Sequence, residues 1–126
     1  MFDTRTKIIS MAKFRERLLA PQPPQALVIG HFDPVVYLHT ERLNALAAEY
    51  GPLAVCVTSS SDPLLPARAR AELAAALSCT EFVTVGEPAE VAVLAAMTGF
   101  AVFDETHDDL RRREALMQHV RERQKA

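Results

Sequence analysis

The chain has 126 residues, of which 49% are hydrophobic and 24% are charged, and its formal net charge is -2. This composition is that of a folded domain of ordinary size, which buries a core without disulfides or metals, and it excludes wholesale disorder. The slightly acidic balance supplies no basic field for duplex DNA or RNA and no polybasic patch for a membrane surface. We therefore expect neither nucleic acid nor a membrane among the partners.

Cysteine usage and the N-terminus bear on where the protein works. Cys56 and Cys79 lie in apolar stretches without metal-ligand spacing, which predicts free thiols in a reducing compartment. No apolar run is long enough to span a bilayer, and residues 1–17 are too charged for a secretory signal. The sequence thus predicts a cytoplasmic protein.

The first part of the chain predicts a short helix and a stiff connector ahead of the main fold. Ser10 is a good N-cap for a helix through Leu18, and three prolines between residues 21 and 24 end it. We assign residues 1–24 to this helix and connector and residues 25–126 to the core of a single domain.

Four short apolar runs then alternate with stretches of helical periodicity. Such runs are typical of strands buried on both faces of a parallel sheet, with helices as the crossovers. Gly51 and Gly99 mark helix ends, and Pro88 suits a first helical turn. Thr106 and Asp109 have the spacing of a capping box for a last helix that runs to about residue 122. The predicted strands lie near residues 26–30, 53–58, 81–85 and 100–104.

The loop from Gly30 to His39 is the principal candidate site, because ligands of parallel sheets bind at the carboxyl ends of strands. Gly30 lets a ligand approach the backbone, and His39 stands where helix N–H groups and the dipole favour an anion. His39 can therefore stabilise charge in phosphoryl or nucleotidyl transfer, with His31 as a second candidate donor. Asp33 is suited to orienting a neighbour or holding the turn, and we expect His31, Asp33 and His39 to line one cleft at the carboxyl end of the first strand. A proline turn with a surface histidine fits the same spacing.

Among the other polar groups, one run has both a ligand-binding and a structural interpretation, and the rest are interpreted as solvated surface residues. The run from Ser59 to Ser61 offers hydroxyls to a phosphate or forms a polar turn. The arginines at positions 111–113 are interpreted as a solvated helix face, and His107 and His119 as solvated residues. The first loop lacks the spacing of metal ligands, so no protein metal site is predicted.

The run Gly30-His31-Phe32-Asp33-Pro34-Val35 followed by His39 resembles the signature of the cytidylyltransferase-like nucleotidyltransferases, which reads Gly, any residue, Phe, Asp, two residues, His, any residue, Gly, His. Lys7-Ile8-Ile9-Ser10 and the segment from Arg70 to Val83 are similar to the heptose 1-phosphate adenylyltransferase branch. The similarity extends over roughly residues 7–85. It implies a Rossmann-like α/β fold, with about four parallel strands in the order 3-2-1-4 and helices on both faces.

The resemblance also implies an activity and a site. The family transfers a nucleoside monophosphate from ATP or CTP to a phosphorylated small molecule and uses Mg²⁺. By this resemblance His39 and His31 are the catalytic candidates, and Arg70 matches an arginine that could face the substrate, although a surface charge on an alanine-rich helix fits it equally. The residues implied to bind nucleotide or phosphate are Gly30, His31, Phe32, Asp33, His39, Ser59 and Arg70.

The sequence departs from the family at the positions that handle charge. Val36 and Leu38 stand where the motif has a histidine and a glycine, and no lysine falls near Phe103 or in the loop after the second strand. The family's fifth strand and its Ser/Thr-rich loop have no counterpart. Removal of one preorganised donor typically costs about 100- to 1000-fold in rate. We therefore expect weakened or absent transfer.

Two hypotheses follow. The chain is either a nucleotidyltransferase with little or no activity, or a non-catalytic domain that binds a nucleotide or phosphate or serves in assembly. The missing strand would leave a sheet edge and an apolar face, which predicts self-association as a homo-oligomer, a dimer in its simplest form.

Overall fold

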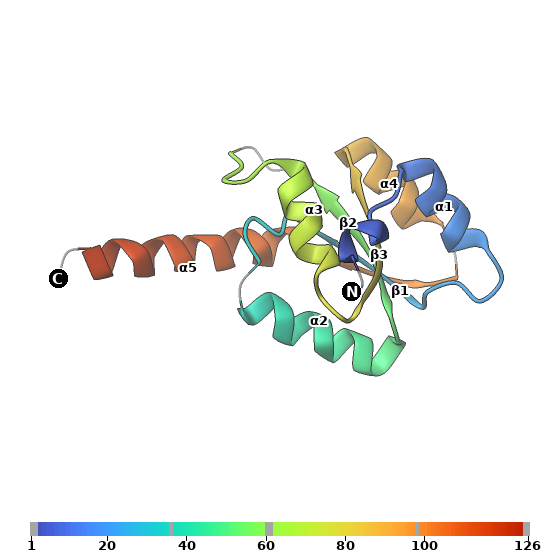
Figure 1. The fold of residues 1–126 in the computed structure, drawn as a ribbon, viewed down its shortest axis with the longest axis horizontal. Coiled ribbons are helices and arrows are strands. Elements are labelled where there is room, and N and C mark those ends of the chain that lie inside the picture. Colours follow the sequence, from blue (N-terminus) through green and yellow to red (C-terminus); the bar gives the residue numbers. More distant parts are fainter. Residues whose placement is uncertain (1–2, 36, 60–61, 98, 125–126) are drawn as a thin grey trace.

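Strands and helices alternate along the chain as the sequence predicts (Figure 1). The computed structural model describes residues 3–35, 37–59, 62–97 and 99–124. In chain order the elements are η1 (Thr4–Lys7), α1 (Met11–Leu19), β1 (Ala26–Gly30), α2 (Tyr37–Tyr50), β2 (Leu53–Thr58), α3 (Ala67–Ala75), β3 (Thr80–Gly86), α4 (Pro88–Ala96), β4 (Ala101–Asp104) and α5 (Thr106–Gln124).

The four strands form one parallel sheet in the order β3-β2-β1-β4. Both the α/β class and the predicted order 3-2-1-4 are therefore confirmed. In the register, Ile29 of β1 lies beside Cys56 of β2 and Asp104 of β4. The carboxyl ends of these three strands consequently meet at one edge of the sheet, where the order of strands reverses between β1 and β4.

Helices cover both faces of the sheet, and each face has its own apolar core. Alternate residues of β1 serve the two cores: Leu27 and Ile29 pack with α1 and α4, whereas Ala26 and Val28 pack with α2 and α3. On the first face Phe14 of α1 meets the Phe82 ring edge-on at 5.1 Å between centroids. The N-terminal helix is thus part of the core rather than a lead-in to it.

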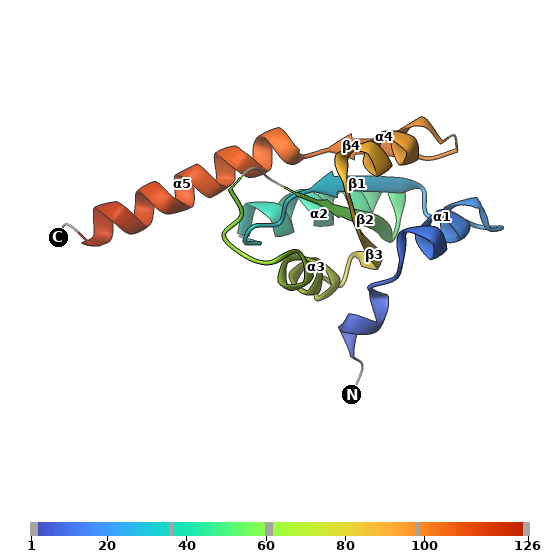
Figure 2. The same cartoon turned by 90° about the horizontal axis from the view of Figure 1, so that it is seen from above.

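Helix α5 differs from the others because most of it extends away from the sheet (Figures 1 and 2). Its first turns lie at the carboxyl edge, where Asp109 and Arg113 are its buried residues.

Among the described residues, no helix combines the length and the apolar character needed to cross a bilayer. The thiols of Cys56, which is buried, and Cys79, which is half-buried, are both free.

The predicted capping box at the start of α5 is wrong. Thr106 is the first helical residue, and its N–H and hydroxyl both donate to Asp104 Oδ1, at 3.0 and 2.7 Å. Because Asp104 already caps this end from two residues upstream, the side chain of Asp109 is available for a tertiary contact.

The prediction that three consecutive arginines form a solvated face is also wrong. The Arg111 side chain is 73% exposed, but those of Arg112 and Arg113 are only 14% and 10% exposed. Successive helical residues point about 100° apart, so three in a row cannot share one face.

Candidate functional site

The turn after β1 places neighbouring side chains on opposite faces of the sheet. Phe32 has a φ of +52°, a left-handed conformation that is rare for a bulky residue. Its ring joins the α2-side core, 5.7 Å from the ring of His39. His31 instead lines a cavity under α4. Such strain persists only where surrounding contacts enforce it, and it is common at functional sites.

The carboxylate of Asp109 occupies the position beside this turn that an anion would take. Oδ2 accepts the backbone N–H of His31 at 2.8 Å. Oδ1 lies 2.7 Å from Nε2 of His39 and 2.8 Å from Nη1 of Arg112. A Cβ on Gly30 would lie only 2.6 Å from Oδ2, so the approach of the carboxylate requires glycine there. A main-chain N–H, an imidazole and a guanidinium are the groups that bind phosphate oxygens, and here they bind the chain's own carboxylate.

Burial and charge act in opposite directions on Asp109. Burial raises the pKa of this carboxyl, but the contacts with His39, His31 and Arg112 together outweigh burial and hold the pKa below its usual value of 3.8. The gap around the cluster admits no water-sized volume. His39, 3% exposed, therefore faces Asp109 and not an open cleft.

Asp33 ties two loops together. Its carboxylate oxygens accept the backbone N–H groups of Leu64 and Leu65 at 2.7 and 2.8 Å, and Nη1 of Arg113 lies 3.6 Å from Oδ2. These contacts join the loop after β1 to the loop before α3. The role that the structure supports for Asp33 is to hold the turn.

Arg70 is buried under the same loops. Its guanidinium donates to the backbone carbonyls of Thr58, Leu65 and His31, at 2.8, 3.1 and 3.2 Å. It thus faces neither solvent nor an open cavity, and it braces the carboxyl ends of β1 and β2.

A cavity of about 590 Å³ opens on the α4 side of the same sheet edge. It lies at the reversal of strand order, where open parallel sheets bind ligands. Its walls are mostly aliphatic and its polar groups come from the ends of β1, β2, β4 and the first turn of α5. It is lined by Ile29, His31, Thr58, Ser59, Pro88, Val91, Ala92, Ala95, Val102, Asp104, Thr106, His107 and Leu110.

Two polar groups of this cavity offer hydrogen-bond acceptors to a ligand. Nδ1 of His31 lies 3.2 Å from the carbonyl oxygen of Thr58, and a carbonyl only accepts, so Nδ1 carries a proton and the neutral ring presents Nε2 as an acceptor. Asp104 uses Oδ1 to hold Thr106, and its second oxygen adds an acceptor. The buried hydroxyl of Thr58 has no partner among the described residues. Buried polar atoms without partners are uncommon, and Thr58 is one of the residues that line the cavity.

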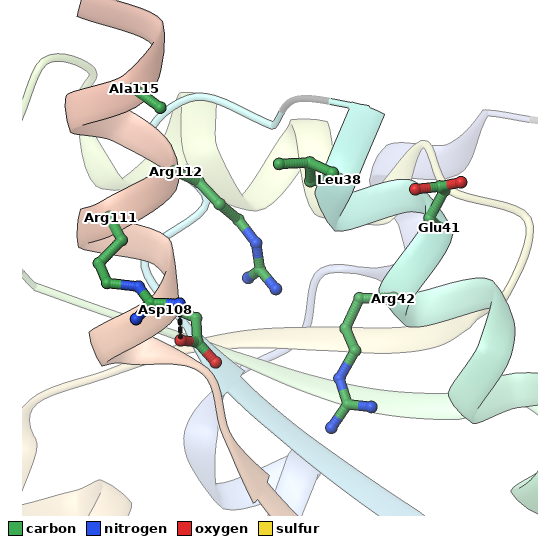
Figure 3. A pocket seen from close by; sticks show the side chains of 7 residues that line it. All are labelled: Leu38, Glu41, Arg42, Asp108, Arg111, Arg112 and Ala115. Atoms are coloured by element: carbon green, nitrogen blue, oxygen red, sulfur yellow. Dashed lines mark ion pairs between the residues drawn. The ribbon is translucent and has the colours of Figure 1, made fainter.

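A second cavity, of about 520 Å³, lies on the other side of α5, against α2 (Figure 3). Arg112 points into it from α5, and Arg42 approaches from α2 (Figure 3). Each arginine there has a carboxylate partner: Arg42 with Glu105 at 2.6 Å, Arg111 with Asp108 at 3.5 Å, and Arg112 with Asp109 at 2.8 Å. The cavity therefore carries no surplus of positive charge.

No protein-family model matches the chain, and no curated protein matches it. The likeness to nucleotidyltransferases accordingly rests on the motif around Gly30 and His39 and on its flanking segments, and the fold rests on the structure.

The carboxylates at the turn do not fit the magnesium ion that this likeness implies. Mg²⁺ is usually held by one or two carboxylates together with substrate phosphates. Both oxygens of Asp33 and of Asp109 already face N–H donors, and a cation cannot share those positions. Within the described ranges no cluster of three or more His, Cys, Asp or Glu residues is placed to hold a metal.

The structure separates the predicted site residues into three groups. Gly30, Phe32 and His39 surround Asp109; Asp33 and Arg70 brace the loops; and His31 and Ser59 line the α4-side cavity. The predicted convergence of His31, Asp33 and His39 in one cleft does not occur. Val36, Ser60 and Ser61 lie outside the described residues.

Sequence reasoning missed Asp109 and Arg112. One signal was available for α5. The apolar stripe of Leu116, Met117 and Val120 continues at helical spacing through Arg113 to Asp109. That periodicity indicates that Asp109 faces the body of the domain.

Proposed function

We propose that this domain is a non-catalytic binder of small molecules of the nucleoside and nucleotide class, and that it descends from nucleotidyltransferases. The α4-side cavity is the binding site. The observation that carries the proposal is this cavity, which sits at the reversal of strand order and combines aliphatic walls with a few convergent polar groups. Volumes of about 300–1000 Å³ with this kind of lining are typical of small-molecule sites.

The lining suits a base and a ribose. Val91 and Ala95 of α4, together with Val102 and Leu110, give the cavity apolar surface against which a flat ring can pack. The hydroxyl of Ser59 and the ring of His31 stand at the strand ends, where they reach the hydroxyls of a sugar. Apolar walls thus supply the binding energy, and the polar groups fix the orientation.

The position of Asp109 beside the turn after β1 argues against nucleotidyl transfer. Transfer concentrates negative charge beside the first loop, but Asp109 already places a buried carboxylate there. Two unit charges of like sign about 4 Å apart repel by about 4 kcal/mol at an effective dielectric constant of about 20. His39, the surviving histidine of the motif, contacts this carboxylate. A phosphate would have to displace Asp109 before His39 could reach it.

Titration calorimetry on the full chain tests the proposal, with ATP, CTP, their monophosphates and the two nucleosides as probes. Ala95→Phe fills the cavity from an exposed position on α4, and we expect it to weaken binding at least tenfold. Ala96→Phe places the same ring next to it, outside the cavity lining, and serves as the matched control. Equal binding by both variants, or by neither wild type nor variant, would contradict the proposal.

A nucleotidyltransferase with residual activity is the competing function, and the motif likeness supports it. An assay for pyrophosphate release with ATP or CTP, Mg²⁺ and heptose 1-phosphate or glycerol 3-phosphate separates the two. We expect no release above the protein-free rate. Sustained turnover by the wild-type chain would establish the enzyme instead.

Self-association is a separate hypothesis with its own support. An apolar groove of about 410 Å³ lies between the distal half of α5 and the loops beside it, lined by Pro34, Leu64, Leu65, Leu116, Met117, Val120 and Arg121. Sedimentation equilibrium should give the mass of a dimer. A monomer at every concentration would refute it.

A further inference from the structure

We infer that the α4-side cavity selects the dephosphorylated form of its ligand, a neutral nucleoside, over the corresponding nucleotides. This inference rests on the proposed function and narrows its ligand class. Three independent features of the described residues lead to it: the charge of the lining, the direction of its hydrogen bonds, and the occupation of the neighbouring anion position.

The lining offers no permanent positive charge. None of its residues is lysine or arginine, and Asp104 contributes a carboxylate. Arg70 and Arg112, which lie at the same sheet edge, are committed elsewhere, because Arg70 donates to backbone carbonyls and Arg112 to Asp109. A phosphate monoester carries between one and two negative charges at neutral pH. In this cavity it would meet repulsion from Asp104, with no lysine or arginine in the lining to compensate.

Two groups of the lining, Asp104 and His31, favour a ligand that donates hydrogen bonds. The second oxygen of Asp104 is an acceptor, and Nε2 of His31 is an acceptor in the neutral tautomer whose Nδ1 donates to Thr58. Ribose hydroxyls and the amino group of adenine or cytosine donate to such acceptors. The oxygens of an ionised phosphate only accept, so they gain nothing from either group.

The adjacent anion position cannot take the phosphate instead. The first turns of α5 separate the cavity from the arginines: Thr106, His107 and Leu110 face the α4 side, whereas Asp108, Arg111 and Arg112 line the α2 side. Between them Asp109 holds the N–H of His31. A ligand in the cavity therefore finds the donors of the turn already bound to a carboxylate.

Titration calorimetry at fixed pH and salt, with the full chain, measures the selectivity directly. The probes are adenosine, AMP and ATP, and cytidine, CMP and CTP. For at least one base we expect the nucleoside to bind at least about tenfold more tightly than its monophosphate, with the triphosphate no tighter than the monophosphate. Competition by the nucleoside and loss of binding in Ala95→Phe place the ligand in the cavity.

Asp104→Asn tests the charge argument. Asparagine keeps an oxygen that caps Thr106 but removes the negative charge, so the preference for nucleoside over monophosphate should shrink at least threefold. Asp108→Asn makes the same change of charge four residues later, outside this cavity, and should leave the preference unchanged. A shift of equal size in both variants would overturn the assignment to Asp104.

The outcomes separate this inference from the function on which it rests. Nucleotides that bind as tightly as the nucleoside, in the cavity, overturn the selectivity and leave the proposed function standing. If no nucleoside or nucleotide binds, the proposed function fails and the inference fails with it.

Discussion

The two sides of the first turns of α5 differ in how their polar groups are satisfied. On the α2 side, the donors around the Gly30 turn contact Asp109 and the space between them admits no water. On the α4 side, the same sheet edge keeps a cavity of about 590 Å³ and a buried hydroxyl, that of Thr58, without a partner in the described chain. Donors that could serve phosphate chemistry thus stabilise the fold on one side, and the room for a ligand lies on the other.

The largest effect is expected from removing the carboxylate of Asp109, which binds the donors around the Gly30 turn. Asp109→Ala would leave His39 and Arg112 buried without their shared anion, and we expect a loss of about 3–5 kcal/mol in the free energy of unfolding. Asp108→Ala, which removes an ion pair on the more exposed face of α5, should cost about 0.5–1 kcal/mol. Urea denaturation of both variants measures the difference. Similar losses would show that the closed turn is not a principal source of stability.

Gly30→Ala disturbs the same turn by adding a side chain at the last residue of β1. The new Cβ would lie 2.6 Å from Asp109 Oδ2 and 2.8 Å from Cε2 of Phe32, so we expect a loss of about 2 kcal/mol. In the double variant with Asp109→Ala one of these clashes is absent. The combined loss should therefore fall short of the sum by at least about 0.5 kcal/mol. Full additivity would mean that Asp109 and Gly30 do not constrain each other.

The arginine run gives a contrast within α5 itself. Arg112→Ala removes a largely buried partner of Asp109 and should cost about 1.5 kcal/mol. Arg111→Ala removes an exposed side chain and should change stability by about 0.5 kcal/mol or less. Equal effects would restore the interpretation of the run as one solvated face.

A smaller effect concerns pH. The pKa of Asp109 is lowered in the folded protein by its contacts with His39, His31 and Arg112, which outweigh the opposing effect of burial. Its stabilisation is therefore complete above about pH 4 and is lost as the pH falls through the folded pKa. The gap in unfolding free energy between wild type and Asp109→Asn should be largest near pH 7 and narrow at pH 3. A gap that stays constant would contradict the lowered pKa.

Local sequence patterns were enough for the fold and insufficient for the site. The capped start of α1 is an example that succeeded, because Ser10 Oγ accepts the N–H of Lys13 three residues away. The apolar runs likewise predicted all four strands, but only β1 and β2 are buried on both faces. The residues of β4 are half-buried or exposed, because it is an edge strand and its apolar run says nothing of its place in the sheet. Asp109 is the opposite case. Its partner His31 is 78 residues away, so its nearest sequence neighbours suggested a helix cap.

The most direct test of the closed turn is whether an external anion can replace the carboxylate of Asp109. Asp109→Ala is unfolded in urea at increasing concentrations of inorganic phosphate, beside wild type and Asp108→Ala at the same concentrations. A saturable gain of stability confined to Asp109→Ala is predicted, about 1.4 kcal/mol at ten times the dissociation constant, because phosphate would take up the N–H of His31 with His39 and Arg112. Equal responses of the three proteins to phosphate would contradict the account.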